Sequence, residues 1–479
     1  MPVLGKVLSY VGRALSGGSP APTEGLRSHA RGTGTSSGPV LVRWTVSDGA
    51  VPDPAAPPPR GGPSRPRLGG VLTEAEARAV HERWKSQGGY VVVVSDSGRC
   101  RMTSGYQSWK QRVELFLSHP PEEVRDKVEG WRRWLGEHEL HARWLVTQKG
   151  MAPRVPGPVP FDLAIQVFEG DPLGAPPGVT FRPIRVFSVK LPGGSRYSFH
   201  DDPVQFGETG PIHEAGVARI GVKLHKHPDL EGLLTEAGLT DATERKAMKK
   251  IAEMERGFEA INTCDPNDIS VGFVPFAAGE TGESPLSRLL RSMKSADPGE
   301  FDDYFRSLGI DVSERGLMVV HPEDGRLLRG REAVHAIRDD KRLTAVFQNA
   351  GEKSRAYQVS QLRLAREMYY LASQDFMLKC LIKAGDKALV ITLLGRYGDV
   401  LRSEAGKVAI MDRAVHRGLG NAQQMFKEAC TSVIQEKGIT TLRALAEYEA
   451  LITPLVQPPG RIRVMEDKEL SQPTAAPEL

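Results

Sequence analysis

The sequence predicts an α+β protein of several domains, and three patterns along the chain lead to this class. Apolar residues recur at helical spacing through most of residues 228–456. Runs of β-branched residues between Gly and Pro turns are typical of residues 151–227. Both patterns occur within residues 71–150. The length of 479 residues, with 40% hydrophobic residues, suffices for roughly two to four domains.

The two ends of the chain lack the composition of a folded core. Residues 1–70 and 457–479 are rich in Gly, Pro, Ser and Ala, as in "VPDPAAPPPRGGPSRPRLGG". Such segments bury too little apolar surface to offset the entropy lost on ordering, so we expect a flexible leader and a flexible tail. The first residues place apolar side chains on one helical face but lack the continuous apolar run of a secretion signal. We therefore expect no Sec signal and synthesis in the cytoplasm, with an export route outside the Sec pathway left open.

Residues 71–150 are predicted to form a small α+β module. "LTEAEARAVHERWKS" has a Thr near its start and acidic residues in the first turn, as helices do. "GGYVVVVSDSGRCRM" predicts a strand or hairpin, and "PPEEVRDKVEGWRRWLGEHELHARWLV" predicts another helix. The β-rich segment that follows, residues 151–227, holds the predicted strands "DLAIQVF", "VTFRPIRVFSVKL" and "GVARIGVKL".

Residues 228–456 are predicted to be mainly helical. The first long helix is "TDATERKAMKKIAEMERGFEAIN", residues 240–262, which opens with Asp241 as N-cap and Glu244 three residues later. Asn262 is its expected C-cap. Further helices are predicted at 284–295, 300–309, 356–385, 386–401, 420–438 and 441–456.

Composition and motifs exclude several classes of function. Charged residues make up 25% of the chain and the net charge is only +4, without a basic stripe, so no nucleic acid partner is predicted. Widely spaced cysteines without a CxxC pair indicate neither a zinc site nor a disulfide framework. "HKHPD" at residues 225–229 lacks a third ligand at fixed spacing, so no metal is predicted. The absence of an apolar stretch of about eighteen residues predicts no integral membrane segment.

The segment "FEAINTCDPNDISVGFVPFAAG", residues 258–279, carries the candidate chemistry. A glutamate at a helix end beside apolar Phe258 is partly desolvated, which raises its pKa and keeps a proton available for general acid catalysis. An aspartate on the polar turn that follows stays ionised and can activate water. Glu259 and Asp265 fit these two roles, and two carboxyl groups in unlike environments are what glycoside hydrolysis requires. On the residues alone, a solvated helix end and an Asp-Pro turn explain the same pattern.

The order of these features resembles the lysozyme superfamily, which includes phage and goose-type lysozymes, lytic transglycosylases and chitosanases. The shared order is a helix-end Glu, a short β-hairpin, a Gly followed by an aromatic residue, and a helix. The chitosanase spacing is matched by Asp265, Ser270, Gly272 and Phe273. "FEAINTCD", "SVGFVPF" and "GESPLSRLL" are similar to a group of predicted bacterial cell-wall proteins. The resemblance covers about residues 228–455 and implies a helical, lysozyme-like domain.

The resemblance implies hydrolysis of a β-1,4-linked amino sugar polymer, with peptidoglycan ahead of chitosan and without a cofactor. Glu259 would protonate the glycosidic oxygen, Asp265 would act as the base, and Ser270 would help to place the water. The residues implied for the cleft floor, the groove and the helix behind it are Gly272, Phe273, Gln361 and Asp412.

Two positions of this motif leave alternatives open. Glu255 could replace Glu259 as the acid, and Asp268 could replace Asp265 as the acidic partner. Pro275 stands where the family usually has Gln or Thr, and its backbone cannot donate a hydrogen bond. This departure favours a first rival function, a catalytically inactive cell-wall-binding protein. The proline-rich leader and the absence of a Sec signal suit a second rival, a structural component of a secretion or phage-tail-like assembly.

Overall fold

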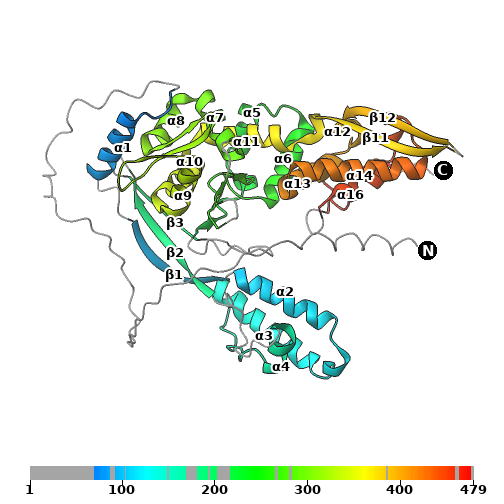
Figure 1. The fold of residues 1–479 in the computed structure, drawn as a ribbon, viewed down its shortest axis with the longest axis horizontal. Coiled ribbons are helices and arrows are strands. Elements are labelled where there is room, and N and C mark those ends of the chain that lie inside the picture. Colours follow the sequence, from blue (N-terminus) through cyan, green and yellow to red (C-terminus); the bar gives the residue numbers. More distant parts are fainter. Residues whose placement is uncertain are drawn as a thin grey trace, which may run out of the picture. The chain divides into compact units, whose positions relative to one another are not determined.

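The fold of the chain is given by a computed structural model. The residues that the structure describes are 70–86, 92–102, 104–147, 150–168, 181–191, 195–201, 216–264, 268–279, 283–384, 387–458 and 463–475. The predicted leader, residues 1–70, lies almost entirely outside these ranges. The mixed α+β class predicted from the sequence is confirmed, because helices alternate with small antiparallel sheets (Figure 1).

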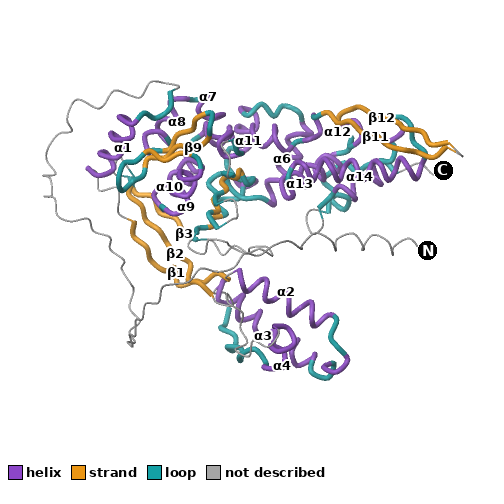
Figure 2. The backbone as a smooth tube through the Cα atoms, viewed as in Figure 1, coloured by secondary structure: helices purple, strands orange, loops and turns teal. Residues whose placement is uncertain are grey.

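Helices and strands follow one another along the chain as Figure 2 shows. The α-helices are α1 (Glu74–Ser86), α2 (Ser104–Ser118), α3 (Val128–Thr147), α4 (Phe161–Phe168), α5 (Leu230–Glu236), α6 (Ala242–Met254), α7 (Pro285–Ala296), α8 (Pro298–Tyr304), α9 (Arg331–Asp339), α10 (Lys341–Lys353), α11 (Arg355–Tyr369), α12 (Tyr397–Val400), α13 (Glu404–Arg417), α14 (Leu419–Lys437), α15 (Leu442–Ala446) and α16 (Glu449–Val456). The strands are β1 (Val92–Met102), β2 (Phe181–Lys190), β3 (Arg196–His200), β4 (Ala218–Arg219), β5 (Ile261–Asn262), β6 (Ser270–Val271), β7 (Phe276–Ala277), β8 (Ile310–Ser313), β9 (Gly316–Val320), β10 (Leu327–Arg329), β11 (Asp375–Ala384) and β12 (Lys387–Arg396).

The strands pair into separate antiparallel sheets. Within the described residues their orders are β1–β2–β3, β4–β5–β6–β7, β10–β9–β8 and β11–β12. Strands β11 and β12 pair along their whole lengths, with Met377 opposite Leu394. The strands of the β4–β5–β6–β7 sheet have only two residues each, and this sheet lies in the candidate site.

Helix α1 packs against a sheet that is far away in sequence. Trp84 of α1 shares a buried apolar cluster with Met318 of β9. Just before the helix, the N–H of Leu72 donates a hydrogen bond to Asp311 Oδ2 at 2.7 Å. Strand β1 in turn pairs with β2. Contacts therefore cross the domain boundaries predicted after residues 150 and 227.

Helices α2, α3 and α4 share a buried cluster that includes Trp109, Trp131 and Leu163. The segment "DLAIQVF" belongs to α4, so the strand predicted there is wrong. Leu163 and Val167 lie one turn apart and are both buried, which is the spacing of a helix face. A short apolar run of this length fits a strand and a buried helix equally well in sequence.

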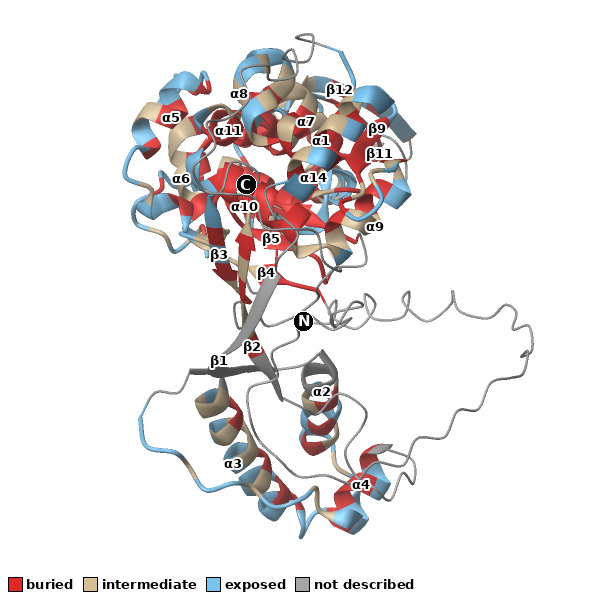
Figure 3. Ribbon diagram, turned by 90° about the vertical axis from the view of Figure 1, so that its left-hand side faces the viewer, coloured by how far each residue is buried: buried red, intermediate tan, exposed pale blue. Residues whose placement is uncertain are grey.

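The main apolar core surrounds helix α13. The side chains of α13 are almost all buried from Ala405 to Val415. Helices α6, α14 and α16 pack against it. In Figure 3 the buried residues gather around α10 and α11, which belong to the same core. The candidate site is built on the α6, α10 and α11 side of this core.

Part of the expected tail also packs on this core. Val464 and Leu470 are buried, and the N–H of Ala405 donates to the carbonyl of Ser471 at 3.1 Å. This differs from the flexible tail expected at 457–479. These two apolar side chains anchor an otherwise polar stretch. The average composition of the segment does not reveal them.

The long helix predicted at 356–385 is divided in the structure. Helix α11 ends at Tyr369, and the chain continues as β11, which pairs with β12 in the segment predicted as a helix at 386–401. Both helix predictions are therefore wrong over the strands Asp375–Ala384 and Lys387–Arg396. The residues of β11 buried on its inner face, next to α14, are Phe376, Leu378, Cys380 and Ile382. This period of two is that of a strand.

Candidate functional site

Helix α6 begins where the sequence predicts and ends earlier. The Asp241 side chain accepts a hydrogen bond from the N–H of Glu244 at 2.8 Å, as an N-cap does. The last helical residue is Met254, and Glu255 is the C-cap. The predicted helix end at Asn262 is therefore wrong, since Asn262 belongs to strand β5. Of the two candidate acids, Glu255 stands at the observed helix end and Glu259 lies beyond it.

A glycine explains why the chain leaves the helix at this point. The N–H of Gly257 donates to the carbonyl of Ile220 at 2.8 Å, which brings two loops together. A Cβ at residue 257 would lie 2.3 Å from the carbonyl oxygen of Val222. Only glycine permits this close approach of two backbones.

The sheet β4–β5–β6–β7 carries Ser270 and leads to Gly272. Ser270 of β6 is buried and lies opposite Asn262 of β5 and Ala277 of β7. Gly272 follows in the left-handed region, with φ of +88°. Its N–H donates to the carbonyl of Ala260 at 2.8 Å. Ser270 and Gly272 thus belong to the packed interior of this small sheet.

Gln361 of α11 joins two parts of the motif. Its Oε1 accepts a hydrogen bond from the N–H of Phe273 at 3.1 Å, and its Nε2 donates to the carbonyl of Phe258 at 3.0 Å. A Cβ at Gly272 would lie 2.4 Å from Gln361 Oε1, so this position also requires glycine. Gln361 and Phe273 are completely buried, whereas the resemblance implies a glutamine that faces the groove.

Glu259 lies in a turn between α6 and β5, and its side chain is enclosed. The residue is 5% exposed, and Oε1 accepts a hydrogen bond from the N–H of Val222 at 2.6 Å. Burial raises the pKa of Glu259, while the Val222 N–H and the positive charge of Arg219 oppose this rise. The expected raised pKa is therefore present, but in a buried carboxyl group.

Three glycines leave the space that Glu259 occupies. A Cβ at Gly221 would lie 2.6 Å from the Glu259 carboxyl carbon, and one at Gly257 would lie 2.7 Å from Oε2. A Cβ at Gly351 of α10 would lie 2.3 Å from the Cα of Glu259. The backbone is thus packed around this side chain, as around a structural residue.

An ionic network adjoins Glu259. The guanidinium of Arg219 donates to Glu352 Oε1 at 2.7 Å, to the Tyr197 hydroxyl at 2.6 Å and to Gln348 Oε1 at 2.8 Å. The negative charge of Glu352 contributes to the raised pKa of Glu259. The Glu352 side chain is 31% exposed, so the network reaches solvent. Glu352 is the second carboxylate that the structure brings near Glu259.

Sequence reasoning missed this network because its members come from three distant segments. Tyr197 lies on β3, Arg219 on β4 and Glu352 on α10. A single sequence holds no local signal for such pairs. The Gly351–Glu352 dipeptide within a helix was the one available hint, because a buried helix glycine often marks close backbone packing.

The two candidate aspartates have different outcomes. Asp265 lies outside the described residues. Asp268 is almost buried and adopts a φ of +62°. Its carboxylate accepts a hydrogen bond from Arg338 Nη1 at 2.5 Å and lies 3.4 Å from His335 Nε2. Asp268 therefore anchors the loop to α9.

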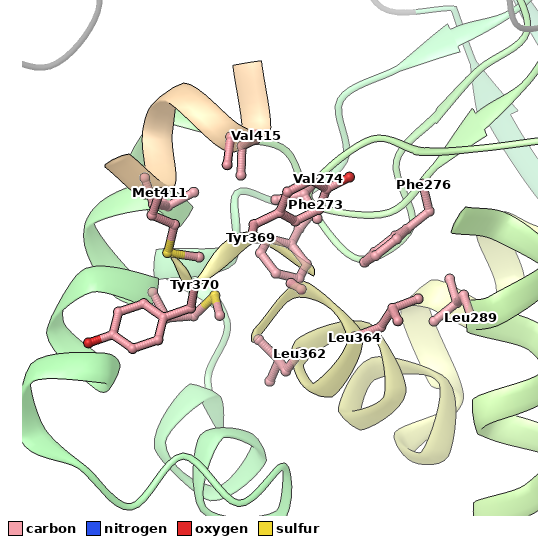
Figure 4. Close-up of a cluster of buried hydrophobic side chains, with 14 of the residues drawn as sticks. Phe273, Val274, Phe276, Leu289, Leu362, Leu364, Tyr369, Tyr370, Met411 and Val415 are labelled. Carbon is pink, nitrogen blue, oxygen red and sulfur yellow. The ribbon is translucent and has the colours of Figure 1, made fainter. Parts of the chain in front are cut away.

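Glu255 is half-buried and belongs to a different environment from Glu259. Its negative charge and the positive charge of Arg288 both act on the Tyr369 hydroxyl. Burial is the main cause that raises the pKa of Tyr369 to about 12. Tyr369 belongs to the cluster of buried apolar side chains in Figure 4, which also holds Phe273. Glu255, at the C-cap of α6, and Arg288 of α7 thus both act electrostatically on Tyr369 of α11.

Asp412 lies in the interior of the core. It is completely buried in α13, next to Met411 of the cluster in Figure 4. The resemblance implies a buried helix that carries this aspartate, and its burial suits a scaffold residue rather than one that contacts substrate.

Comparisons with known proteins add no family to this description. The chain matches no protein-family model, no curated protein and no solved structure. Among the described residues, no group of three His, Cys, Asp or Glu side chains is placed to hold a metal ion. The same part of the chain contains no helix with the length and apolar character to cross a membrane.

Proposed function

We propose that the protein hydrolyses a β-1,4-linked amino sugar polymer, with peptidoglycan ahead of chitosan, and that Glu255 is the general acid. One observation carries the proposal. Glu255 caps the C-terminus of α6, and the chain then enters the short strands β5, β6 and β7. A helix-end glutamate followed by a short hairpin is the arrangement that the resemblance to lysozymes implies for the acid.

Access favours Glu255 over Glu259 for this role. A general acid has to come within hydrogen-bond distance of the glycosidic oxygen. Glu255 is half-buried, whereas Glu259 is 5% exposed and is enclosed by the backbones of Gly221, Gly257 and Gly351. Glu259 then supports the loop that carries Glu255. Its enclosure by backbone supports a structural role for this carboxyl group rather than proton donation.

The second carboxyl group of the proposal is Asp265, as the resemblance implies. It would activate the water on the opposite side of the sugar ring. Carboxyl groups about 6.5–9.5 Å apart give inversion at the anomeric carbon, and about 5–5.5 Å gives retention. The stereochemistry of the product therefore reports the separation of Glu255 and Asp265.

A second candidate function is a wall-binding protein without catalysis, or a structural component of a secretion or phage-tail-like assembly. Two observations favour it. Glu259 and Asp268, two of the carboxyl groups in the motif, are bound to Val222 and Arg338 within the fold. Pro275 provides no backbone N–H in the turn between β6 and β7, where the family has a residue that can bind substrate.

The test compares two glutamine variants on purified sacculi. Glu255→Gln is expected to abolish the release of reducing ends while the melting temperature stays near that of wild type. Glu259→Gln is the matched control, because it removes a carboxyl group four residues away and is expected to retain cleavage. Cleavage that is lost in Glu259→Gln but kept in Glu255→Gln would assign the acid to Glu259. Wild-type protein that binds sacculi without cleaving them would establish the binding function.

A further inference from the structure

The outer face of the β11–β12 hairpin, which points away from α14, is apolar and exposed. Two cross-strand pairs form most of it, Met377 opposite Leu394 and Leu381 opposite Val390. These four side chains are 53%, 67%, 53% and 65% exposed, in this order. Among the strands whose side chains are described, only β11 and β12 carry exposed large apolar residues. Single exposed apolar residues are common on protein surfaces, whereas adjacent ones that form a patch mark an interaction site.

One cation lies between the two apolar pairs. Lys379 is opposite Thr392, and this row is two residues from each apolar pair along the strands. Residues two apart on a strand point to the same face and lie about 6.6 Å apart. Lys379 is exposed, and among the described residues its ammonium group has neither a hydrogen bond nor an ion pair. By contrast, the row at the end of the hairpin contains its own ion pair, between Asp375 and Arg396. The outer face therefore presents an apolar, a cationic and an apolar row.

The inner face shows which kind of element fits this hairpin. Helix α14 packs against β11 on that side. Gln435 of α14 donates from Nε2 to the carbonyl of Leu381 at 3.2 Å, and Cys380 Sγ lies 3.5 Å from Thr431 Oγ1. Residues four apart in a helix are separated by about 6 Å along its axis, which is close to the spacing of the rows. A second helix that runs along the strands can therefore place side chains on all three rows of the outer face.

The charge of Lys379 distinguishes between the possible occupants. When the apolar pairs of two copies of this chain stack on one another, the row with Lys379 stacks on its own equivalent, so two ammonium groups repel each other. Inserting the face into a bilayer would carry the same ammonium group into hydrocarbon, which is unfavourable. Residues 1–18 of this chain have apolar residues at helical spacing but contain Lys6 and Arg13 and no acidic residue. A carboxylate in the middle row complements Lys379 without these costs.

We propose that the outer face binds an amphipathic helix of a partner protein, in which an acidic residue lies between two apolar residues, each one turn away. The apolar residues of the helix pack on the pair Met377–Leu394 and on the pair Leu381–Val390, and the carboxylate pairs with Lys379. This interaction goes beyond the proposed hydrolysis. None of its residues belongs to the proposed site at Glu255, so either proposal can fail without the other.

Binding to the full-length protein is measured by fluorescence anisotropy with two synthetic amphipathic peptides of about 20 residues, a length that supports helix formation. Both peptides carry leucines on one face, and a Glu in the first peptide is replaced by Lys in the second. Wild type is expected to bind the Glu peptide about tenfold more tightly than the Lys peptide. Lys379→Glu should reverse this preference. Lys427→Glu, which changes an exposed lysine on α14, is the matched control and should leave it intact.

Val390→Thr tests the apolar part of the face. It keeps a β-branched side chain that suits a strand, and it is expected to weaken binding of the Glu peptide by about fivefold. Melting temperatures report whether each variant folds. If Lys379→Glu does not fold, Lys379→Gln takes its place and should bind the two peptides equally.

Three peptide results would overturn the proposal: equal affinity of wild type for the two peptides, binding of neither, or a preference that persists in the Lys379 variant. Analytical ultracentrifugation without peptide is a further test. A dimer that Val390→Thr dissociates would assign the face to a second copy of this chain. Binding to phosphatidylglycerol vesicles in place of the Glu peptide would assign it to a membrane surface. Either result would refute the partner helix.

Discussion

The Oε1 atom of Gln361 accepts the N–H of Phe273 at 3.1 Å, while the Nε2 atom of the same side chain donates to Phe258. One buried amide group on α11 thereby links the loop that begins after Glu255 to the turn that follows β6. Phe258 and Phe273 are also in edge-to-face contact, with ring centroids 5.8 Å apart. The polar and apolar contacts hold the same two segments together.

Replacing Gln361 by Leu is expected to destabilise the protein by about 2–6 kcal/mol. The substitution leaves a buried N–H and a buried carbonyl without partners, and each costs about 1–3 kcal/mol. Urea unfolding measures the change. Gln424→Leu on α14 is the control, because Gln424 is exposed and should be within about 0.5 kcal/mol of wild type. A Gln361→Leu protein as stable as this control would contradict the bridging role.

Gly351→Ala is expected to be more harmful than an ordinary glycine substitution in a helix. The new Cβ would lie 2.3 Å from the Cα of Glu259, so α10 would have to move away from the loop. We expect a loss of at least about 3 kcal/mol or a failure to fold. Gly420→Ala in α14 meets nothing within 4 Å and should stabilise the protein by up to about 1 kcal/mol. Similar thermal stability of the two variants would refute the close packing.

The sequence predicted the start of α6 better than its end. Asp241 and Glu244 form a cap through local contacts, which a single sequence can reveal. The end at Met254 depends on Gly257 meeting Val222, a contact between loops that sequence spacing does not encode. The raised pKa predicted for Glu259 is present in the structure. Its enclosure by Gly221 and Gly351 comes from tertiary contacts, which have no local signal in the sequence.

The strands β11 and β12 illustrate a second kind of limit. Phe376 and Leu378 alternate with exposed residues, yet the segment directly follows a strong helical pattern in α11. A helix that is correctly predicted for α11 is easily extended into the apolar residues of β11 that follow it. The charge partners Arg219 and Glu352 lie 133 residues apart, and no periodicity reports such a pair.

Trp84→Ala tests whether α1 belongs to the same folded unit as β9. Trp84 is 2% exposed and shares a cluster with Met318, so its removal should cost about 3–5 kcal/mol. Amide hydrogen exchange at Met318 and Val320 should accelerate in the variant. Arg78→Ala changes an exposed residue of the same helix and should leave exchange in β9 unchanged. Unaltered exchange in Trp84→Ala would mean that α1 does not support this sheet.

The raised pKa of Glu259 gives a pH dependence with a definite sign. A carboxyl group whose pKa is higher in the folded state than its ordinary value of 4.5 stabilises the fold when protonated. This contribution is fully present below that value and is lost as the pH rises through the pKa of the folded state. Each unit of the rise corresponds to about 1.4 kcal/mol. At a pH above the pKa of the folded state, Glu259 carries a buried negative charge next to Glu352.

Glu259→Gln should therefore gain stability relative to wild type as the pH increases. The glutamine stays neutral, and its Oε1 can still accept the N–H of Val222. Urea unfolding at about pH 4 and about pH 8 measures the difference between the two proteins, which should become more favourable to the variant at the higher pH. Glu314→Gln removes an exposed carboxyl group in the turn between β8 and β9 and is the matched control. If Glu259→Gln behaved like Glu314→Gln, Glu259 would have an ordinary pKa. Its carboxyl group would then not be desolvated by the surrounding backbone.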